Sequence, residues 1–281
     1  MTAAGFGSRL SVALATSGRL CVGIDPHPFL LREWGLEDRA SSLREFGLRV
    51  IDAAVDRVGV VKPQLAFFER FGAAGYVAAE EILRTAREAG LLVIADVKRG
   101  DVGSTVEAYA QAWLQPGSPL EADAMTVAAF QGVGSLAAPV RLALEAGKGL
   151  FVLAATSNPE AAPLQRARVE GGTTVAATIL EEVRRAGGSD GGVASIGVVL
   201  GATLDLGEFG IDIADAPDPA LPVLAPGFGH QGARLEDASR IFGGLLQAAI
   251  VSESRSLLAA GPDGIRAAVE RRSREVQDAL G

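Results

Sequence analysis

The chain has few of the residues that build disulfide frameworks, metal clusters and nucleic-acid grooves. Its 281 residues include one cysteine, two histidines and 5% aromatic residues. The single cysteine, Cys21, excludes an internal disulfide and fits a reducing compartment, so we expect a cytoplasmic protein. No spacing of histidine, cysteine and carboxylate residues indicates a metal site. The net charge of −8, without a basic tract, argues against a nucleic-acid partner.

Long hydrophobic runs are also missing. No apolar stretch approaches the roughly 20 residues that a helix needs to cross a membrane, and the N-terminus lacks a signal-peptide pattern. We therefore expect neither a membrane partner nor secretion. What the chain does have is 48% hydrophobic residues and 35 glycines. This composition supports a large core with many short turns, which favours an α/β protein.

Apolar runs typical of strands alternate along the chain with helical patterns. Strands are predicted at 20–24, 58–62, 91–97, 122–127, 149–155, 195–200, 221–225 and 248–252. Helices are predicted at 42–57, 68–89, 104–114, 134–146, 173–186, 235–243 and 262–279. The acidic segment 202–220, which contains proline and glycine, is predicted to be mostly an irregular loop.

Alternating strands and helices imply a parallel sheet with right-handed crossovers. Eight strands over this length predict a closed (β/α)8 TIM barrel, with residues 1–281 forming a single domain. A doubly wound open sheet is the alternative fold. In a barrel, polar residues that follow the strands gather at one rim, which is where barrel enzymes place their active sites.

The most informative charges end the third predicted strand. Asp96 and Lys98 leave the strand on the same face, because side chains alternate, and Asp101 lies just beyond. Two carboxylates around one ammonium are costly to bury unless each is paired, and such clusters more often do chemistry than hold a fold together. Lys62 ends the preceding predicted strand. A solvated turn rich in charge is the alternative interpretation.

Other predicted strands also end in polar residues. The segment 226–232 after the seventh strand is rich in glycine, which lets backbone N–H groups approach an anion closely. Gln231 supplies a neutral donor, and Arg255, after the eighth strand, supplies a charged, forked one. Loops after strands seven and eight often bind phosphate in barrel enzymes, so a phosphate site is predicted here. A plain turn and a surface arginine are the alternatives.

Together these segments resemble orotidine 5′-phosphate decarboxylase, in the bacterial branch seen in actinobacteria. The resemblance rests on Asp96-x-Lys98-x-x-Asp101 with Lys62, on the run 98–105, and on segments 23–28, 61–64, 154–159 and 197–203. It extends from about residue 23 to about residue 255. It implies a homodimer that converts orotidine 5′-monophosphate to uridine 5′-monophosphate and CO2, in pyrimidine synthesis, with neither metal nor organic cofactor.

The resemblance also implies a role for each matching residue. Lys98 would donate the proton to carbon 6 of the pyrimidine. Asp96 would face the substrate carboxylate, and Lys62 would pair with Asp96 and touch the ribose. Asp101 and Thr105 would reach the neighbouring subunit's site, where Asp101 completes a Lys-Asp-Lys-Asp array. The residues implied for binding within the subunit are Asp25 for the ribose, Ser157 for the pyrimidine, and Gln231 and Arg255 for the phosphate.

Two segments depart from this branch, and two other functions stay open. Ala128-Ala129-Phe130 stands where an Asn- or Ser-Pro-Tyr turn is usual, and 203–222 has no match. The first alternative is a magnesium-dependent sugar-phosphate decarboxylase or aldolase on the same barrel. Such enzymes place a carboxylate where Lys62 stands, and a lysine would repel the metal. The second is a non-catalytic binding protein for a nucleotide monophosphate, which would not need two carboxylates near an anion.

Overall fold

The computed structural model describes residues 4–188 and 192–281, and its centre is a closed barrel of eight parallel strands. Neighbours in the sequence pair in parallel, and β8 closes on β1 by pairing Cys21 with Ser252. The strands are β1 (Leu20–Ile24), β2 (Val60–Pro63), β3 (Leu92–Arg99), β4 (Ala124–Ala128), β5 (Gly149–Ala155), β6 (Ile196–Leu200), β7 (Val223–Pro226) and β8 (Ala249–Glu253). The predicted (β/α)8 barrel is therefore confirmed, and each predicted strand is present.

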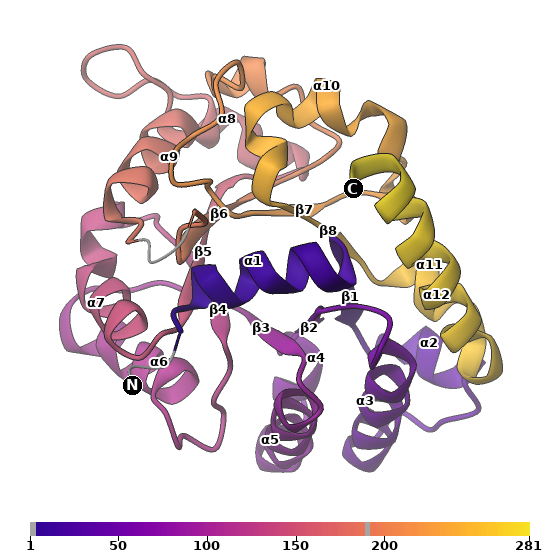
Figure 1. The fold of residues 1–281 in the computed structure, drawn as a ribbon. Coiled ribbons are helices and arrows are strands. Elements are labelled where there is room, and N and C mark those ends of the chain that lie inside the picture. Colours follow the sequence, from indigo (N-terminus) through magenta and orange to yellow (C-terminus); the bar gives the residue numbers. More distant parts are fainter. Residues whose placement is uncertain (1–3, 189–191) are drawn as a thin grey trace.

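Helices form a ring around the strands (Figure 1). The α-helices are α1 (Phe6–Ser17), α2 (Pro28–Glu33), α3 (Ala40–Ala54), α4 (Ala66–Glu69), α5 (Gly72–Glu88), α6 (Gly103–Leu114), α7 (Ala137–Glu145), α8 (Ala162–Gln165), α9 (Val175–Ala186), α10 (Ala238–Phe242), α11 (Arg255–Leu258) and α12 (Gly261–Leu280). The short 3-10 helices are η1 (Val133–Leu136), η2 (Pro159–Ala161), η3 (Leu206–Phe209), η4 (Gly229–Gln231), η5 (Leu235–Asp237) and η6 (Gly243–Ala248).

Two helical predictions need correction, and four α-helices were not predicted. The helix predicted at 68–89 is two helices, because Gly72 has a φ of +57° that interrupts the right-handed path between α4 and α5. The helix predicted at 235–243 is a single short α-helix, α10, with a 3-10 turn on each side. The α-helices that no pattern predicted are α1, α2, α8 and α11. The irregular segment 202–220 is confirmed, apart from the short η3.

Helix α1 closes the end of the barrel where the strands begin (Figure 1). Phe6 is fully buried and packs edge-on against Phe151 of β5, with ring centroids 6.0 Å apart. Leu10 joins the same apolar cluster, which fills the barrel interior with side chains from the strands. Because α1 plugs the barrel interior at this end, we expect a ligand of the barrel at the opposite end, where the strands stop.

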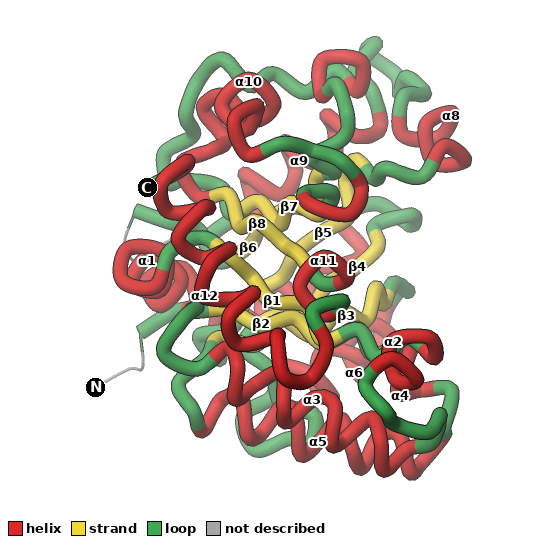
Figure 2. The backbone as a smooth tube through the Cα atoms, turned by 90° about the vertical axis from the view of Figure 1, so that its right-hand side faces the viewer, coloured by secondary structure: helices red, strands yellow, loops and turns green. Residues whose placement is uncertain are grey.

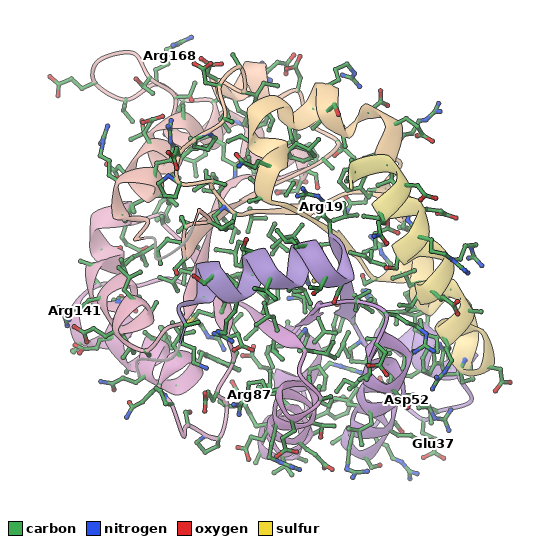
Figure 3. The ribbon with its side chains drawn as sticks, in the orientation of Figure 1. Arg19, Glu37, Asp52, Arg87, Arg141 and Arg168 are labelled. Atoms are coloured by element: carbon green, nitrogen blue, oxygen red, sulfur yellow. The ribbon has the colours of Figure 1, made fainter. Side chains whose placement is uncertain are left out.

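The two ends are separated by the length of the strands. Figure 2 shows α1 on one side of the strands and α2, α4 and α8, which follow β1, β2 and β5, on the other. Charged side chains such as Asp52 and Arg141 lie on the outside of the helical ring (Figure 3). Among the described helices, none is long and apolar enough to span a membrane.

Candidate active site

A cavity of about 510 Å³ opens at the rim where the strands end. Its walls come from strands β2 to β8 and from the loops after β1, β2, β5, β7 and β8. Seven of the nine sequence-predicted site residues line it: Asp25, Lys62, Asp96, Lys98, Ser157, Gln231 and Arg255. The rule that barrel strands deliver their polar ends to one rim therefore holds for this chain.

Lys62, Asp96 and Lys98 form one ion-paired group, which we call the rim cluster. Asp96 accepts a hydrogen bond from Lys62 Nζ on Oδ2 at 2.9 Å and one from Lys98 Nζ on Oδ1 at 2.5 Å. The Lys62 and Asp96 side chains are buried, whereas the Lys98 side chain is 47% exposed. The outer ammonium therefore faces the cavity, and the inner ion pair lies beneath it.

The charges in the rim cluster stabilise one another. Burial opposes the charged form of Lys62, but the carboxylates of Asp96 and Asp25 raise the pKa of Lys62 above its ordinary value. Burial likewise opposes the charged form of Asp96, but the two lysines lower the pKa of Asp96 well below its usual range. Both partners are thus ionised at neutral pH, and the cavity holds a fixed field of alternating charge.

The backbone at Lys98 is held in an uncommon conformation. Lys98 has a φ of +47°, in the left-handed region that non-glycine residues rarely occupy. Such a conformation costs on the order of 1–3 kcal/mol and persists only where the surroundings enforce it. The residue with the strained backbone is therefore also the one whose ammonium faces the cavity.

Thr126 of β4 enforces this arrangement. Its Oγ1 accepts hydrogen bonds from the backbone N–H groups of Val97 and Lys98, both at 3.0 Å. The same hydroxyl donates to Asp96 Oδ1 at 2.8 Å. The register between β3 and β4 shifts at this point, so the side chain replaces bonds that a regular ladder would supply. No sequence pattern indicates the role of Thr126, because threonine is common in apolar strands for its strand propensity alone.

Asp25 brings unused hydrogen-bonding capacity to the same cavity. Its Oδ2 accepts a hydrogen bond from Ser254 Oγ at 2.7 Å. Within the described part of the chain, its other oxygen, Oδ1, is buried and has no hydrogen-bond partner. A buried acceptor without a partner is costly, so Asp25 is suited to receive a hydroxyl from a ligand.

The predicted anion loop borders the same cavity. Gln231 of η4 and Arg255 at the start of α11 both line the cavity. Ser157, which follows β5, donates a hydrogen bond to Gln231 Oε1 at 3.2 Å. This contact joins the loop after β5 to the loop after β7.

Asp101 and Thr105 lie apart from the other predicted residues. Asp101 Oδ1 accepts a hydrogen bond from the N–H of Val102 at 2.8 Å, and neither Asp101 nor Thr105 lines the cavity. Among the described residues, the carboxylate ion-paired with Lys98 is that of Asp96. Val102 and Phe130, on the loops after the adjacent strands β3 and β4, are 54% and 80% exposed.

The cavity offers no cluster of metal ligands. Within residues 4–188 and 192–281, no group of three or more histidine, cysteine or carboxylate side chains could hold a metal ion. Both oxygens of Asp96 already accept hydrogen bonds from ammonium groups, so a cation at this carboxylate would meet two positive charges. The side chains present therefore fit an anionic ligand better than a cation.

A (β/α)8 barrel with lysines and a carboxylate at the rim, beside a glycine-rich anion loop, belongs to the class of barrel enzymes that act on phosphorylated small molecules. A family model described as the orotidine 5′-phosphate decarboxylase / HUMPS family matches residues 18–270. The chain belongs to this family.

Individual relatives are similar over nearly the whole chain. An orotidine 5′-phosphate decarboxylase of Salinispora arenicola is 51% identical over 268 residues, covering 95% of each chain. One of Streptomyces coelicolor is 46% identical over 278 residues, covering 98% of each. A solved structure from Streptomyces avermitilis has a TM-score of 0.93 at 44% identity and covers 100% of this chain and 97% of that one. The Leishmania donovani OMP decarboxylase has a TM-score of 0.78 at 29% identity, covering 98% of each.

Proposed function

We propose that this chain converts orotidine 5′-monophosphate to uridine 5′-monophosphate and CO2. The observation that carries the proposal is the rim cluster, in which Lys98 points its ammonium into the cavity while Asp96 stays ionised beneath it. Membership of the family and the names of its close relatives support the same reaction.

The chemistry asks for a fixed field and a nearby proton. When the bond between carbon 6 and the carboxylate breaks, CO2 leaves and the electron pair stays on carbon 6. Lys98 Nζ then gives a proton to carbon 6 and recovers one from solvent. Asp96 Oδ1 lies 2.5 Å from that ammonium, close to where the substrate carboxylate would lie. Repulsion between the two carboxylates therefore favours departure of the substrate carboxylate as CO2.

Binding at a distance from the reacting carbon holds the substrate against this repulsion. The unpaired Oδ1 of Asp25 would accept a ribose hydroxyl, and Ser157 would contact the pyrimidine. Gln231 and Arg255 would hold the phosphate. Binding energy from the phosphate can then offset the cost of placing two carboxyl groups side by side.

Lys62 separates this proposal from a magnesium-dependent reaction on the same barrel. Its ammonium is buried and lies 2.9 Å from Asp96 Oδ2, where a divalent cation would need a free carboxylate. Orotidine 5′-monophosphate turnover is followed by its ultraviolet absorbance, before and after treatment with excess chelator. We expect turnover to be unchanged by the chelator. Activity that disappears with chelator and returns with magnesium would favour the sugar-phosphate reaction instead.

We also propose a cytoplasmic homodimer of single-domain subunits, with active sites shared between the two chains. Asp101 and Thr105 lie outside the cavity of their own chain. Val102, which follows Asp101, and Phe130, on the loop after the neighbouring strand β4, are both exposed. A second copy covering these residues would bury that apolar surface and bring Asp101 to the partner's Lys98, completing the Lys-Asp-Lys-Asp array.

Subunit mixing tests the shared site. Lys98→Ala and Asp101→Ala proteins should each be nearly inactive. After subunit exchange, a mixed dimer has one site with both residues intact and one with neither. Random pairing makes half the dimers mixed, so roughly a quarter of all sites should recover. Proven exchange without recovered turnover would place Asp101 in the site of its own chain.

A further inference from the structure

A buried carboxylate lies directly behind the predicted phosphate loop. Glu253 ends β8 and lines the cavity, yet its side chain is only 1% exposed. Its Oε1 accepts two hydrogen bonds from Arg272, from Nε at 2.8 Å and from Nη2 at 2.6 Å. Arg272 reaches inward from α12, on the outside of the barrel. None of the expected roles of the site residues uses either side chain.

The other oxygen of Glu253 holds the elements that would grip the phosphate. Oε2 accepts a hydrogen bond from Ser256 Oγ at 2.7 Å, within the same short helix that begins with Arg255. Gly229 of the phosphate loop has a φ of +68° and lies against the same carboxylate. A Cβ at that position would lie 2.6 Å from Glu253 Oε2 and 2.8 Å from Ser256 Oγ. Glu253 therefore touches both phosphate-binding segments at once.

This placement creates an electrostatic conflict that Arg272 resolves. A bare carboxylate behind an anion site would repel the phosphate, and burial in a low-dielectric region would strengthen the repulsion. The guanidinium, which donates twice to Oε1, neutralises Glu253 and fixes its orientation. A hydrophobic contact could have filled the same space, but it could not have accepted the hydrogen bond from Ser256.

We propose that Glu253 and Arg272 are positioning residues for the phosphate: Arg272 neutralises Glu253, and Glu253 holds Ser256 and the turn at Gly229 in the geometry that grips the anion. The proposal rests on the proposed function, because it takes the phosphate of orotidine 5′-monophosphate as the ligand of this loop. The pair acts through its neighbours and contacts no reacting atom.

The test compares a substrate that has the phosphate with one that lacks it. Arg272→Met leaves Glu253 buried and unneutralised, so we expect KM for orotidine 5′-monophosphate to rise on the order of 10- to 100-fold. The value of kcat/KM for orotidine, which has no phosphate, should change by less than about threefold, since its contacts lie on other loops. The double variant with Glu253→Gln should recover much of the loss, because a neutral amide no longer repels the anion.

Arg266→Met is the matched control. Arg266 lies on the same helix, α12, and pairs with Asp52 of α3 at 2.5 Å on the exposed surface. Its loss should alter neither substrate. Thermal unfolding of each variant separates lost fold from lost binding. If Arg272→Met does not fold, the double variant alone decides, because its neutral side chains leave no buried charge. Relative to wild type, we expect its kcat/KM to fall more for orotidine 5′-monophosphate than for orotidine.

Two results would overturn the proposal: equal losses on the two substrates, or a double variant no better than Arg272→Met at binding the phosphorylated one. Either would make the pair a structural brace for α12. A wild-type protein that does not convert orotidine 5′-monophosphate would instead overturn the proposed function. The two failures are therefore distinguishable in the same set of assays.

Discussion

Both ends of the barrel carry buried charges, but only one end has the features of an active site. At the closed end lies what we call the base cluster, which consists of Arg9, Glu121, Asp123 and Lys148. Arg9 Nη1 is 2.5 Å from Asp123 Oδ1, and Lys148 Nζ is 2.7 Å from Glu121 Oε1. A cavity of about 710 Å³ lies at this end too, so a cavity beside buried charge does not by itself distinguish the two ends.

The two ends differ in which charged groups remain exposed or unpaired. In the base cluster, Asp123 accepts on both oxygens, from Arg9 and from the N–H of Val93, and the Lys148 side chain is only 8% exposed. At the rim, Lys98 has a half-exposed ammonium on a strained backbone, and Asp25 has an unpaired oxygen. The cavity at the closed end is also lined by a residue with positive φ, Asp56 at +63°, and by the Nε of Arg87, which is unpaired among the described residues. The rim differs because its strained residue itself carries the half-exposed ammonium, so charge density alone does not indicate chemistry.

The strongest test of this comparison removes the exposed ammonium. Lys98→Ala should lower kcat on the order of 100- to 10,000-fold for the lost proton donor alone, and loss of the local field should add to this. Binding of uridine 5′-monophosphate should persist, because the phosphate and ribose contacts remain. Steady-state kinetics and calorimetric titration measure the two effects. A variant that keeps more than about a tenth of wild-type kcat would remove Lys98 from the reaction.

The matching change in the base cluster should affect stability instead. Asp123→Ala leaves Arg9 and Lys148 without their shared partner, and breaking a buried ion pair costs about 3–5 kcal/mol of unfolding free energy. We expect kcat of the folded fraction to stay within about twofold of wild type, since the strands separate this cluster from the site. Urea unfolding and initial rates measure both quantities. A large fall in kcat with unchanged stability would mean that the ends are coupled.

Within the rim, the phosphate side can be ranked residue by residue. Arg255→Ala should cost about 1.5–3 kcal/mol in kcat/KM for orotidine 5′-monophosphate, and Gln231→Ala about 0.5–1.5 kcal/mol, because a charged donor binds an anion more strongly than a neutral one. Orotidine is the control substrate. If Arg255→Ala weakens turnover of both substrates equally, Arg255 does not hold the phosphate.

The sequence predicted most of the fold, and the exceptions have local causes. Runs of β-branched and apolar residues located every strand, and the bounds predicted for β1 and β5 match the structure. Helix α1 escaped prediction because it has no acidic first turn and no side-chain cap, and its sequence is rich in small residues. Its position depends on tertiary contacts, such as Phe6 against Phe151, that no local pattern reveals.

The site residues also divide into those that the sequence predicts and those that depend on tertiary contacts. Residues that follow strands, such as Asp96 and Arg255, could be predicted because the barrel brings every strand end to one rim. Thr126 and Glu253 could not be predicted, because their contacts are distant in the sequence. Thr126 bonds to Asp96, 30 residues away, and Glu253 bonds to Arg272, 19 residues away. The shared-site role proposed for Asp101 rests on the resemblance, since Asp101 lies outside the cavity of its own chain.

Thr126 provides a finer test within the rim. Thr126→Val keeps the shape but leaves the N–H groups of Val97 and Lys98 unpaired, at about 1–3 kcal/mol, and frees Asp96 to turn. We expect kcat to fall about tenfold with little change in KM, and Thr126→Ser to restore it. Thr174→Val is the control, because Thr174 is also buried and its hydroxyl bonds to Phe209 and Ala177, and none of these residues lines the cavity. Equal effects of the two valine substitutions on kcat would contradict a positioning role.

The smallest effect concerns how the base cluster responds to acid. Burial opposes the charge of Glu121, but hydrogen bonds from Lys148 and the N–H of Gly117, with the charge of Arg87, lower the pKa of Glu121. The unfolded chain, with a glutamate pKa of about 4.3, therefore takes up this proton first as pH falls. The stability from Glu121 is fully present above about pH 5 and is lost as pH falls through about 4 toward the folded-state pKa.

Glu121→Gln removes this titration while keeping the shape of the side chain. Its unfolding free energy should be lower than that of wild type at pH 7 and should decline less steeply between about pH 5 and 3. Urea unfolding at several pH values measures the slope, and kcat at neutral pH should be unchanged. A slope as steep as that of wild type would show that the acid sensitivity originates elsewhere, with the depressed carboxylate of Asp96 at the rim as the first candidate. The rim would then account for the acid sensitivity as well as the chemistry, and the base cluster would differ from it in both respects.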